Sequence, residues 1–389
     1  MSTLIPISNR RPRQIPRVFD FQTSIETIRA HHWRVFSDAY SGCAFTCSYC
    51  LYKGPGDYGR HVKVSPGSAE ADPSMGILDI GTTTDPYQPI EATELRTRGI
   101  LEAALAQQIP VFLLTRGTMV TRDLDVLTEL AKRGLIEVCF SVITLREDLA
   151  RTLEVRAPAP ADRLKAAEQV AAAGIPVSFH VAPVIPGLQS PAEMDRLGYE
   201  LASLSGRHVF NAVLGAQKAW WNTFYGVMEG AADAIDSLEL FRAAYPRELD
   251  FERDAAVNCG LSDALSTLLP FRDGVTRGGA TFVAENFPHL TTGPLEGGIY
   301  RWKLPTVYDM ARWVSAQTGP VDWGAFSAWY AGHTPGDRLT GLVRGLWDQG
   351  ELFVGTAVGP AAEPGTYIGG AEIVETARTT LVARRGARK

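Results

Sequence analysis

Short apolar runs alternate with helical patterns between residues 76 and 214. In the helical stretches the apolar residues recur three or four positions apart, whereas the runs between them are short and continuous. This alternation is typical of β-α units arranged around a parallel sheet. It predicts strands at 35–41, 76–82, 110–115, 136–142, 176–182 and 208–214, and helices at 91–107, 120–133, 161–173 and 191–204.

The helix expected at 120–133 shows the pattern most clearly. Leu124, Leu127 and Leu130 fall three positions apart, which places them on one helix face, and Gly134 stands where helices commonly stop. Six strands with crossover helices predict an α/β fold. We expect a partial TIM-like (β/α)6 barrel rather than an eight-stranded one, because the pattern breaks near residue 215.

The character of the sequence changes in its last third. Seven of the eight tryptophans lie after residue 219. Residues 306–317, 321–331 and 336–349 predict three successive helices, followed by a strand at 351–355. Three helices closing on a strand resemble a winged-helix module, which proteins use for DNA, for peptides or for packing. We therefore expect a mainly helical, winged-helix-like C-terminal extension.

The length of 389 residues exceeds what one ordinary core supports, so we expect more than one domain. The predicted regions are an N-terminal extension at 1–34, the partial barrel at 35–215, an aromatic-rich connecting or substrate region at 216–300, and the winged-helix-like region with a basic tail at 301–389.

The composition is that of a globular protein, with 45% hydrophobic and 21% charged residues, and it excludes a chain disordered throughout. The net charge of −5 provides no field that attracts nucleic acid or an anionic membrane. No apolar run approaches 18 residues, and the first 17 residues lack the apolar segment of a secretory signal. We expect a soluble cytoplasmic protein. Its basic ends are interpreted as solvated tails rather than nucleic-acid arms: Arg10, Arg11, Arg13, Arg17, Arg384, Arg385, Arg388 and Lys389.

The strongest chemical signal is the run Cys43-x3-Cys47-x2-Cys50, directly after the first predicted strand. Three cysteines so close together form no disulfide framework and point to metal ligation. Iron–sulfur clusters usually take four thiolates, so three ligands leave one iron with an open position. The alternative is a zinc site completed by a ligand such as His61.

This spacing, with the aromatic Tyr49 before the last cysteine, resembles the radical S-adenosylmethionine (SAM) superfamily. The resemblance implies that Cys43, Cys47 and Cys50 hold a [4Fe-4S] cluster, that the cluster binds SAM, and that an external flavodoxin- or ferredoxin-type donor supplies one electron. The segments 81–89, 114–117, 138–142 and 181–187 resemble the spore photoproduct lyase-like branch.

The candidate SAM contacts lie in these segments, at the carboxyl ends of the predicted strands, because barrel sites form at the carboxyl ends of strands. Thr83, Thr84 and Asp85 are expected to accept from the SAM amino group, and Arg116 to hold its carboxylate. The alternatives are that Asp85 starts a turn and that Arg116 forms a surface ion pair.

The remaining SAM contacts are expected at the next two strand ends. Ser141 is a candidate for the ribose, and Val181 and Pro183 are candidates for the adenine face. Ser141 is equally interpreted as a cap of the following turn, and Val181 and Pro183 as residues that shape a loop. His180 within the strand is interpreted as a structural histidine.

The candidate catalytic residues are Tyr49 and Cys259. By resemblance to radical epimerases and to the photoproduct lyase, an accessible Cys259 thiol would donate a hydrogen atom. Cys139 is interpreted as a core residue, since free cysteine is commonly buried. The lyase itself has a donor cysteine in the strand that here reads 81–83, and none stands there; Leu51 also replaces its tyrosine. Both differences argue against thymine-dimer repair.

We therefore predict a radical SAM enzyme that abstracts hydrogen from a specialised metabolite (sugar or nucleoside) or a peptide, with epimerisation or rearrangement as outcomes. The aromatic stretch 218–225 is expected to line a pocket or to form an interdomain core. The alternatives are a DNA-lesion lyase and a noncatalytic iron–sulfur or zinc regulator with a winged helix. The expected partners are the substrate and the reductant, without nucleic acid or membrane.

Overall fold

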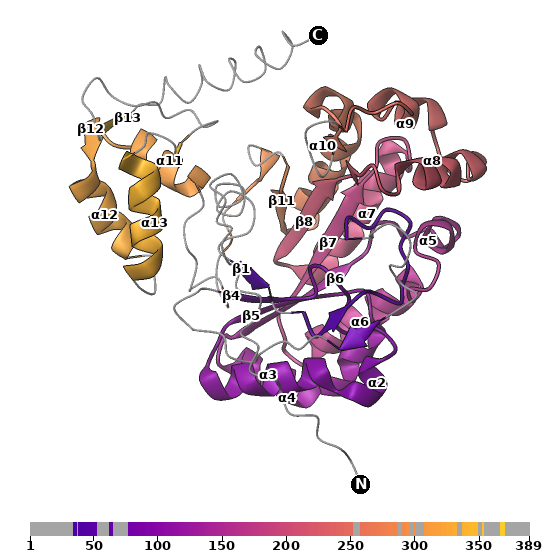
Figure 1. The fold of residues 1–389 in the computed structure, drawn as a ribbon, viewed down its shortest axis with the longest axis horizontal. Helices are drawn as coiled ribbons and strands as arrows, with labels where there is room; N and C mark the ends of the chain where they lie inside the picture. The colour runs from indigo at the N-terminus through magenta and orange to yellow at the C-terminus, as the bar shows by residue number, and fades with distance from the viewer. Residues whose placement is uncertain are drawn as a thin grey trace. The chain divides into compact units, whose positions relative to one another are not determined.

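The structure is a computed structural model (Figure 1). The chain divides into two compact units, and each is described by itself: the first contains Phe36–Ala71 and Leu78–Tyr300, and the second contains Arg301–Lys389. The domain boundaries expected from the sequence stay predictions. The structure describes residues 34–36, 38–52, 62–64, 77–251, 257–286, 290–293, 295, 299, 307–332, 337–348, 352–353 and 366–369.

A seven-stranded sheet organises the first unit, in the order β1-β4-β5-β6-β7-β8-β11. The six strands from β4 to β11 pair in parallel, which agrees with the expected partial barrel. The strands are β1 (Arg34–Phe36), β4 (Ile77–Ile80), β5 (Val111–Thr115), β6 (Ile136–Ser141), β7 (Val177–Val184), β8 (His208–Val213) and β11 (Thr281–Ala284).

The first predicted strand, 35–41, is wrong as a single element. It divides into β1 and β2 (Tyr40–Ser41), and β2 pairs antiparallel with β3 (Lys63–Val64) outside the large sheet. The side chain of Asp38 between them accepts hydrogen bonds from Gly81 and Thr83. The chain between β1 and β2 is therefore held by hydrogen bonds to the Asp38 side chain and not by strand pairing.

Strand β11 lies beyond the alternation that predicts the barrel. It pairs with β8 after an excursion of the chain through three helices, which separate the two strands in sequence. The sequence pattern therefore predicts the parallel architecture but omits the strand at its far edge. Within the segment between β8 and β11, β9 (Gly215–Ala216) pairs antiparallel with β10 (Val257–Asn258).

Two predicted helices differ from those observed. The helix expected at 91–107 divides at Leu95, whose φ is 52°, because the Glu91 carboxylate accepts from the backbone N–H groups that start the second part. The helix expected at 120–133 begins as a 3₁₀ turn over Thr118–Asp123. The helices of the first unit are α2 (Glu91–Glu94), α3 (Arg96–Gln107), α4 (Leu124–Lys132), α5 (Glu147–Leu153), α6 (Pro160–Ala172), α7 (Pro191–Ser205), α8 (Trp221–Gly230), α9 (Leu238–Ala244) and α10 (Leu261–Arg277).

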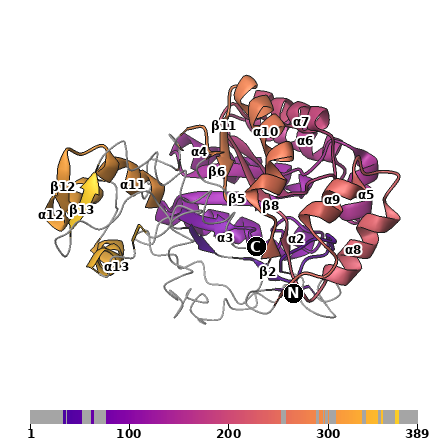
Figure 2. The same ribbon diagram turned by 90° about the horizontal axis from the view of Figure 1, so that it is seen from above.

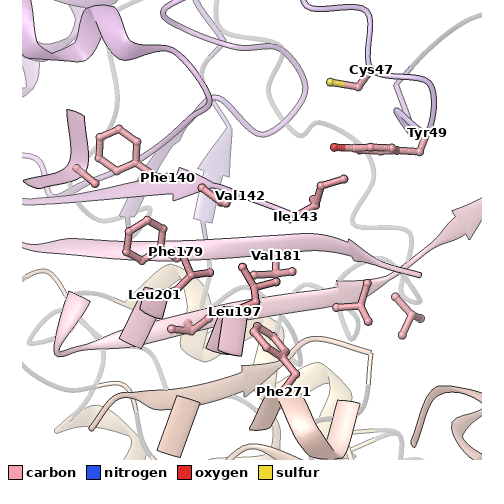
Figure 3. Close-up of a cluster of buried hydrophobic side chains, with 14 of the residues drawn as sticks. Cys47, Tyr49, Phe140, Val142, Ile143, Phe179, Val181, Leu197, Leu201 and Phe271 are labelled. Atoms are coloured by element: carbon pink, nitrogen blue, oxygen red, sulfur yellow. The ribbon is translucent and has the colours of Figure 1, made fainter. Parts of the chain in front are cut away.

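The two faces of the large sheet differ in chemistry. Neighbouring partners in a parallel ladder point to the same face. Phe140 and Phe179 share the face that packs against α7 and α10 (Figure 3), and Val209, the ladder partner of Phe179, points to the same face. Helices α6, α7 and α10 lie together on that side (Figure 2). We call this the outer face. The opposite, inner face carries polar residues such as Asp79 and Ser141.

The described part of the second unit contains three helices and an antiparallel strand pair, with a core rich in aromatic side chains. The strand expected at 351–355 is wrong at Leu352 and Phe353, which form a turn packed into this core; its other residues, and both basic ends, lie outside the described residues. The elements are α11 (Val307–Ser315), β12 (Gly319–Asp322), α12 (Trp323–Ala331), α13 (Asp337–Asp348) and β13 (Thr366–Gly369).

Among the described residues, no helix combines the length and the apolar character needed to cross a membrane.

The end of β4 depends on a glycine. Gly81 has a φ of 103°, and a Cβ added there would lie 2.0 Å from the Leu114 carbonyl oxygen. We expect Gly81→Ala to lower the free energy of unfolding by about 3 kcal/mol, because the conformation is strained and the oxygen belongs to the backbone. Urea unfolding measures it.

The matched control is Gly99→Ala in α3, where nothing lies within 4 Å of the added Cβ. This change should raise the free energy of unfolding by up to about 1 kcal/mol, since alanine favours a helix. Equal stability of the two variants would contradict the steric argument.

Candidate functional site

The three clustered cysteines lie on a tightly curled loop after β2. Gly42 and Thr46 both have positive φ values, of 82° and 51°, and these turn the chain back on itself. All three thiols are free, and Cys47 is buried. Burial raises the pKa of Cys43 to about 11 and that of Cys47 to about 12, and the charge of Cys50 adds to both shifts. The three cysteines therefore share one tightly turned loop.

The backbone around Cys43 is held by Gln88, which is fully buried. Its Oε1 accepts from the Ala44 N–H at 2.8 Å, and its Nε2 donates to the Gly42 carbonyl at 3.1 Å. The Thr84 hydroxyl donates to the same carbonyl at 2.6 Å. Sequence reasoning missed Gln88 as a site residue, although it quoted the segment 81–89 that contains it.

A buried carboxylate, Glu154, joins the cysteine loop to two strand ends. The Tyr49 hydroxyl donates to its Oε1, Arg116 Nε donates to the same oxygen at 2.9 Å, and Arg163 forms an ion pair with Oε2 at 2.6 Å. Burial favours a raised pKa for Glu154, but the charges of Arg163 and Arg116 hold its pKa below the ordinary value. Sequence reasoning missed Glu154 and Arg163, because neither belongs to a motif.

Arg163 extends this network to the next strand. Its Nη1 donates to the Ser141 carbonyl at 3.0 Å, and only 1% of its surface is exposed. Glu154 thus contacts Tyr49 of the cysteine loop directly, and it is joined to the carboxyl end of β6 through Arg163.

The guanidinium of Arg116 is only partly used by this network. Its Nη2 donates to the Ala182 carbonyl and to the Tyr49 hydroxyl, both at 3.4 Å. Among the described residues its Nη1 has no partner, and one fifth of the side chain is exposed. The acid that pairs with Arg116 is a buried one, unlike the surface ion pair considered from the sequence. Contact with the SAM carboxylate stays a prediction.

The residues predicted to contact the SAM amino group form hydrogen bonds within the protein. The Asp85 carboxylate accepts from Tyr87 N at 2.9 Å, Thr115 Oγ1 at 2.7 Å and Arg116 N at 2.6 Å. Asp85 thus forms a turn and ties it to the end of β5, while burial raises its pKa. Its contact with SAM stays a prediction, as do those of Thr83 and Thr84.

Thr83 donates to Asp38, an acid that sequence reasoning missed. Burial raises the pKa of Asp38 to about 6, and the charge of Asp79 adds to this while the Thr83 hydroxyl opposes it. Two carboxylates therefore lie close together at the carboxyl end of β4.

Ser141, Val181 and Pro183 are all buried. The side chains of Ser141 and Val181 lie on opposite faces of the sheet. The Ser141 hydroxyl has no hydrogen-bond partner among the described residues. The Val181 side chain packs in the outer core with Leu197 and Leu201 (Figure 3), so an adenine contact, which stays a prediction, would fall to its backbone. Pro183 lies where the register between β7 and β8 shifts.

Cys259 follows β10 and is 7% exposed. Burial raises its pKa to about 11, although a hydrogen bond with Tyr245 opposes the shift. The Tyr245 hydroxyl donates to the carbonyl of Leu214, just after β8, at 2.5 Å. Cys259 therefore keeps its S–H at neutral pH. Cys139 in β6 is fully buried.

The aromatic stretch 218–225 packs inside the first unit. Trp221 contacts the rings of Tyr225, Phe241 and Tyr245, and both Trp220 and Trp221 are buried. The aromatic side chains of the stretch therefore form core between α8 and α9, whereas Lys218, Asn222 and Thr223 are exposed.

The donor set of the cysteine loop fits an iron–sulfur cluster, since the loop carries three free thiols within eight residues. In the described part of the chain no three His, Cys, Asp or Glu side chains are grouped closely enough to hold an ion, so the three thiols share the loop without meeting at a centre. His61, the zinc ligand considered from the sequence, lies outside the described residues.

Comparison with known proteins gives a family for this region. The family model described as the Radical SAM superfamily matches residues 39–190. A protein of Mycobacterium tuberculosis, named as uncharacterised, is 31% identical over 210 residues, which are 49% of this chain and 62% of that protein. A protein of Acidianus two-tailed virus, also named as uncharacterised, is 32% identical over 142 residues, 36% of this chain and 46% of that protein. The match thus spans less than two thirds of either relative.

Among solved structures, spore photoproduct lyase complexed with dinucleoside spore photoproduct has a TM-score of 0.48 at 17% identity, covering 64% of this chain and 74% of that one. Streptococcus suis SuiB bound to precursor peptide SuiA has a TM-score of 0.36 at 11% identity, covering 71% of this chain and 65% of that one.

The network around Glu154 leads to a stability prediction. We expect Glu154→Gln to lower the free energy of unfolding by about 3–5 kcal/mol, because it leaves the buried Arg163 without its counter-charge. Urea unfolding measures it, with Glu147→Gln as the control: the exposed Glu147–Arg151 pair should contribute far less, because solvent screens it. Similar losses in the two variants would show that the buried charge is not what stabilises the loop.

Proposed function

We propose that this protein is a radical SAM enzyme that cleaves SAM reductively and abstracts hydrogen from an organic substrate, because the model of the Radical SAM superfamily matches residues 39–190. The observation that carries the proposal is the curled loop with three free thiols within eight residues. When bound, a [4Fe-4S] cluster and SAM supply a 5′-deoxyadenosyl radical that removes hydrogen from an unactivated C–H bond.

Cys43, Cys47 and Cys50 would hold the cluster. Gln88 holds the backbone on both sides of Cys43, so it fixes the first thiol relative to the end of β4. Tyr49, through its bond to Glu154, fixes the last turn of the loop. A ligand loop positioned in this way needs little rearrangement on binding.

SAM would contact the ends of the next strands. The Nη1 of Arg116 is the group available for the methionyl carboxylate, since Nε and Nη2 are bound to the protein. The unpartnered Ser141 hydroxyl is available for the ribose. The amino group falls to the end of β4, where Thr83 and Thr84 lie and where Asp85 fixes the Arg116 backbone.

Cys259 is the proposed hydrogen donor to the substrate radical. Hydrogen-atom donation needs the S–H form, and the raised pKa of Cys259, about 11, preserves it at neutral pH. Its transfer would return hydrogen to the substrate and give epimerisation. The substrate class we favour is a specialised metabolite or a peptide, and an external one-electron donor is the expected partner.

The second unit has the element order α11-β12-α12-α13-β13, with β12 and β13 antiparallel. We propose a winged-helix-like module on this order. The net charge of −5 gives no support to a nucleic-acid partner for it.

Loss of a loop cysteine should abolish the proposed chemistry. We expect Cys43→Ala, Cys47→Ala and Cys50→Ala, purified anaerobically and reconstituted, to lose iron, sulfide and all 5′-deoxyadenosine formation from SAM with dithionite. Cys139→Ala is the control and should retain them, because Cys139 is buried in β6 away from the loop. Stoichiometric zinc without sulfide in the wild type would overturn the proposal and favour the regulator.

The state of the Cys259 thiol can be measured by its alkylation rate against pH. The thiolate is the reacting form, so a pKa near 11 predicts a rate that still rises about tenfold per pH unit between pH 8 and 9.5. Peptide-resolved mass spectrometry with iodoacetamide follows it. Tyr245→Phe should lower the rate further, since it removes the bond that lowers the pKa. A rate that levels off below pH 9 would mean a thiolate-forming cysteine and would argue against the donor role.

A further inference from the structure

The cysteine loop pairs along one stretch with the end of α5 and with the connection to α6, residues 154–159. Ser48 N donates to the Leu153 carbonyl at 2.8 Å, and Arg156 N donates to the Phe45 carbonyl at 3.3 Å. Cys47 lies between the two bonded residues of the loop, and Val155 lies between the two bonded residues of the facing segment. The connection therefore holds Val155 beside the loop that carries the proposed cluster ligands.

Val155 is the most exposed large apolar side chain among the described residues, at 63%. Four others are exposed: Leu51, Tyr52, Leu95 and Tyr199. Leu51 and Tyr52 follow Cys50 directly, so three of the five stand just after the cysteine loop or in the segment paired with it. Single exposed apolar residues are ordinary on a protein surface, but their concentration at one place marks an interaction site.

The exposed charges at 151–157 are positive. Arg151 and Arg156 are both exposed, whereas the only acid of this stretch, Glu154, is buried and ion-paired within the protein. Arg151 pairs with the exposed Glu147, and Arg156 forms no ion pair with another described residue. Residues 43–50 contain no charged side chain. A cation therefore stands beside Val155, on a chain whose net charge is −5.

This position suits the entry of an electron. The rate of electron transfer falls steeply with the distance between two redox centres, so a donor protein has to dock close to the loop that holds the acceptor. A donor seated on the connection would rest against the segment that is hydrogen-bonded to the cysteine loop. Redox partners associate through small surfaces, and complementary charges at such a surface orient the partner and speed its association.

We propose that Val155, Arg156 and Arg151 form the docking surface for an acidic one-electron donor protein, and we call these three residues the donor patch. Val155 packs against the donor, and the guanidinium groups pair with its carboxylates. The donor is oxidised by one electron, which is consumed when the C5′–S bond of SAM breaks into methionine and the 5′-deoxyadenosyl radical. The positive patch orients a partner that the net charge of the whole chain would repel. The inference rests on the proposed function, because that reaction needs the electron.

The test compares two reductants on the anaerobically reconstituted enzyme. Dithionite is a small molecule that needs no docking surface, whereas a purified acidic flavodoxin, reduced photochemically, has to dock. We expect Val155→Glu and Arg156→Glu to lower flavodoxin-driven formation of 5′-deoxyadenosine about tenfold and to leave dithionite-driven formation at the wild-type rate. Arg156→Lys keeps the charge and should retain most of the flavodoxin-driven rate.

The matched controls are Tyr199→Glu and Arg196→Glu on α7. Both side chains are exposed, so these variants introduce the same carboxylate at a surface that is not paired with the cysteine loop. They should change neither the flavodoxin-driven nor the dithionite-driven rate.

A second readout does not depend on turnover. Fluorescence titration of oxidised flavodoxin with the enzyme should give a dissociation constant about tenfold higher for Val155→Glu and Arg156→Glu than for the wild type and the two α7 controls. Added sodium chloride should weaken the binding of the wild type more than that of Arg156→Glu, because salt screens the exposed charge.

The outcomes separate the donor patch from the proposed function. If the wild type forms no 5′-deoxyadenosine with dithionite, the proposed function fails, and the titration alone decides whether the patch binds the donor. If dithionite-driven formation is normal, a flavodoxin-driven rate and affinity that are unchanged in Val155→Glu and Arg156→Glu overturn the donor patch. Equal losses with both reductants also overturn it, because they assign the two side chains to the fold or the reaction. A wild type that neither binds flavodoxin nor accepts its electron overturns the acidic donor.

Discussion

The geometry of the site depends on the hydrogen bond and the ion pairs that the buried carboxylate of Glu154 forms. One buried carboxylate accepts from the tyrosine of the cysteine loop and forms ion pairs with a guanidinium just after β5 and another from α6. These groups come from segments that are far apart in sequence. Burying any one of these charges without its partner would strongly destabilise the fold. Their mutual satisfaction fixes where the loop lies relative to the strand ends.

The sheet beneath this network separates two kinds of chemistry. Its outer face is packed by α7 and α10 and excludes water, which gives the strands a rigid support (Figure 3). Its inner face keeps carboxylates, a histidine and hydroxyls close to the proposed cofactor site. Local pairing in the ladder is what brings Ser141 beside His180, so the positions of the polar groups follow from strand register.

Sequence periodicity predicted the parallel α/β architecture because burial on both faces gives nearly continuous apolar strands, as in β5. It failed at β1 and β2, where Asp38 replaces ladder pairing by side-chain bonds, and at β11, which forms only through a long-range pairing with β8. The cysteines were found from their spacing alone. Gln88, Glu154 and Arg163 were not, because a buried polar residue is recognised by its partners, and the partners of these three lie elsewhere in the chain.

The edge position of β11 has a consequence for how such an enzyme diversifies. The groups proposed for the cofactor all precede residue 190, whereas the strand that leads to Glu285 arrives only after the α8–α10 excursion. The groups proposed for the cofactor and the far edge of the sheet are thus encoded in separate stretches of the chain. A change confined to the second stretch can therefore reshape that edge of the sheet while the groups proposed for the cofactor keep their places.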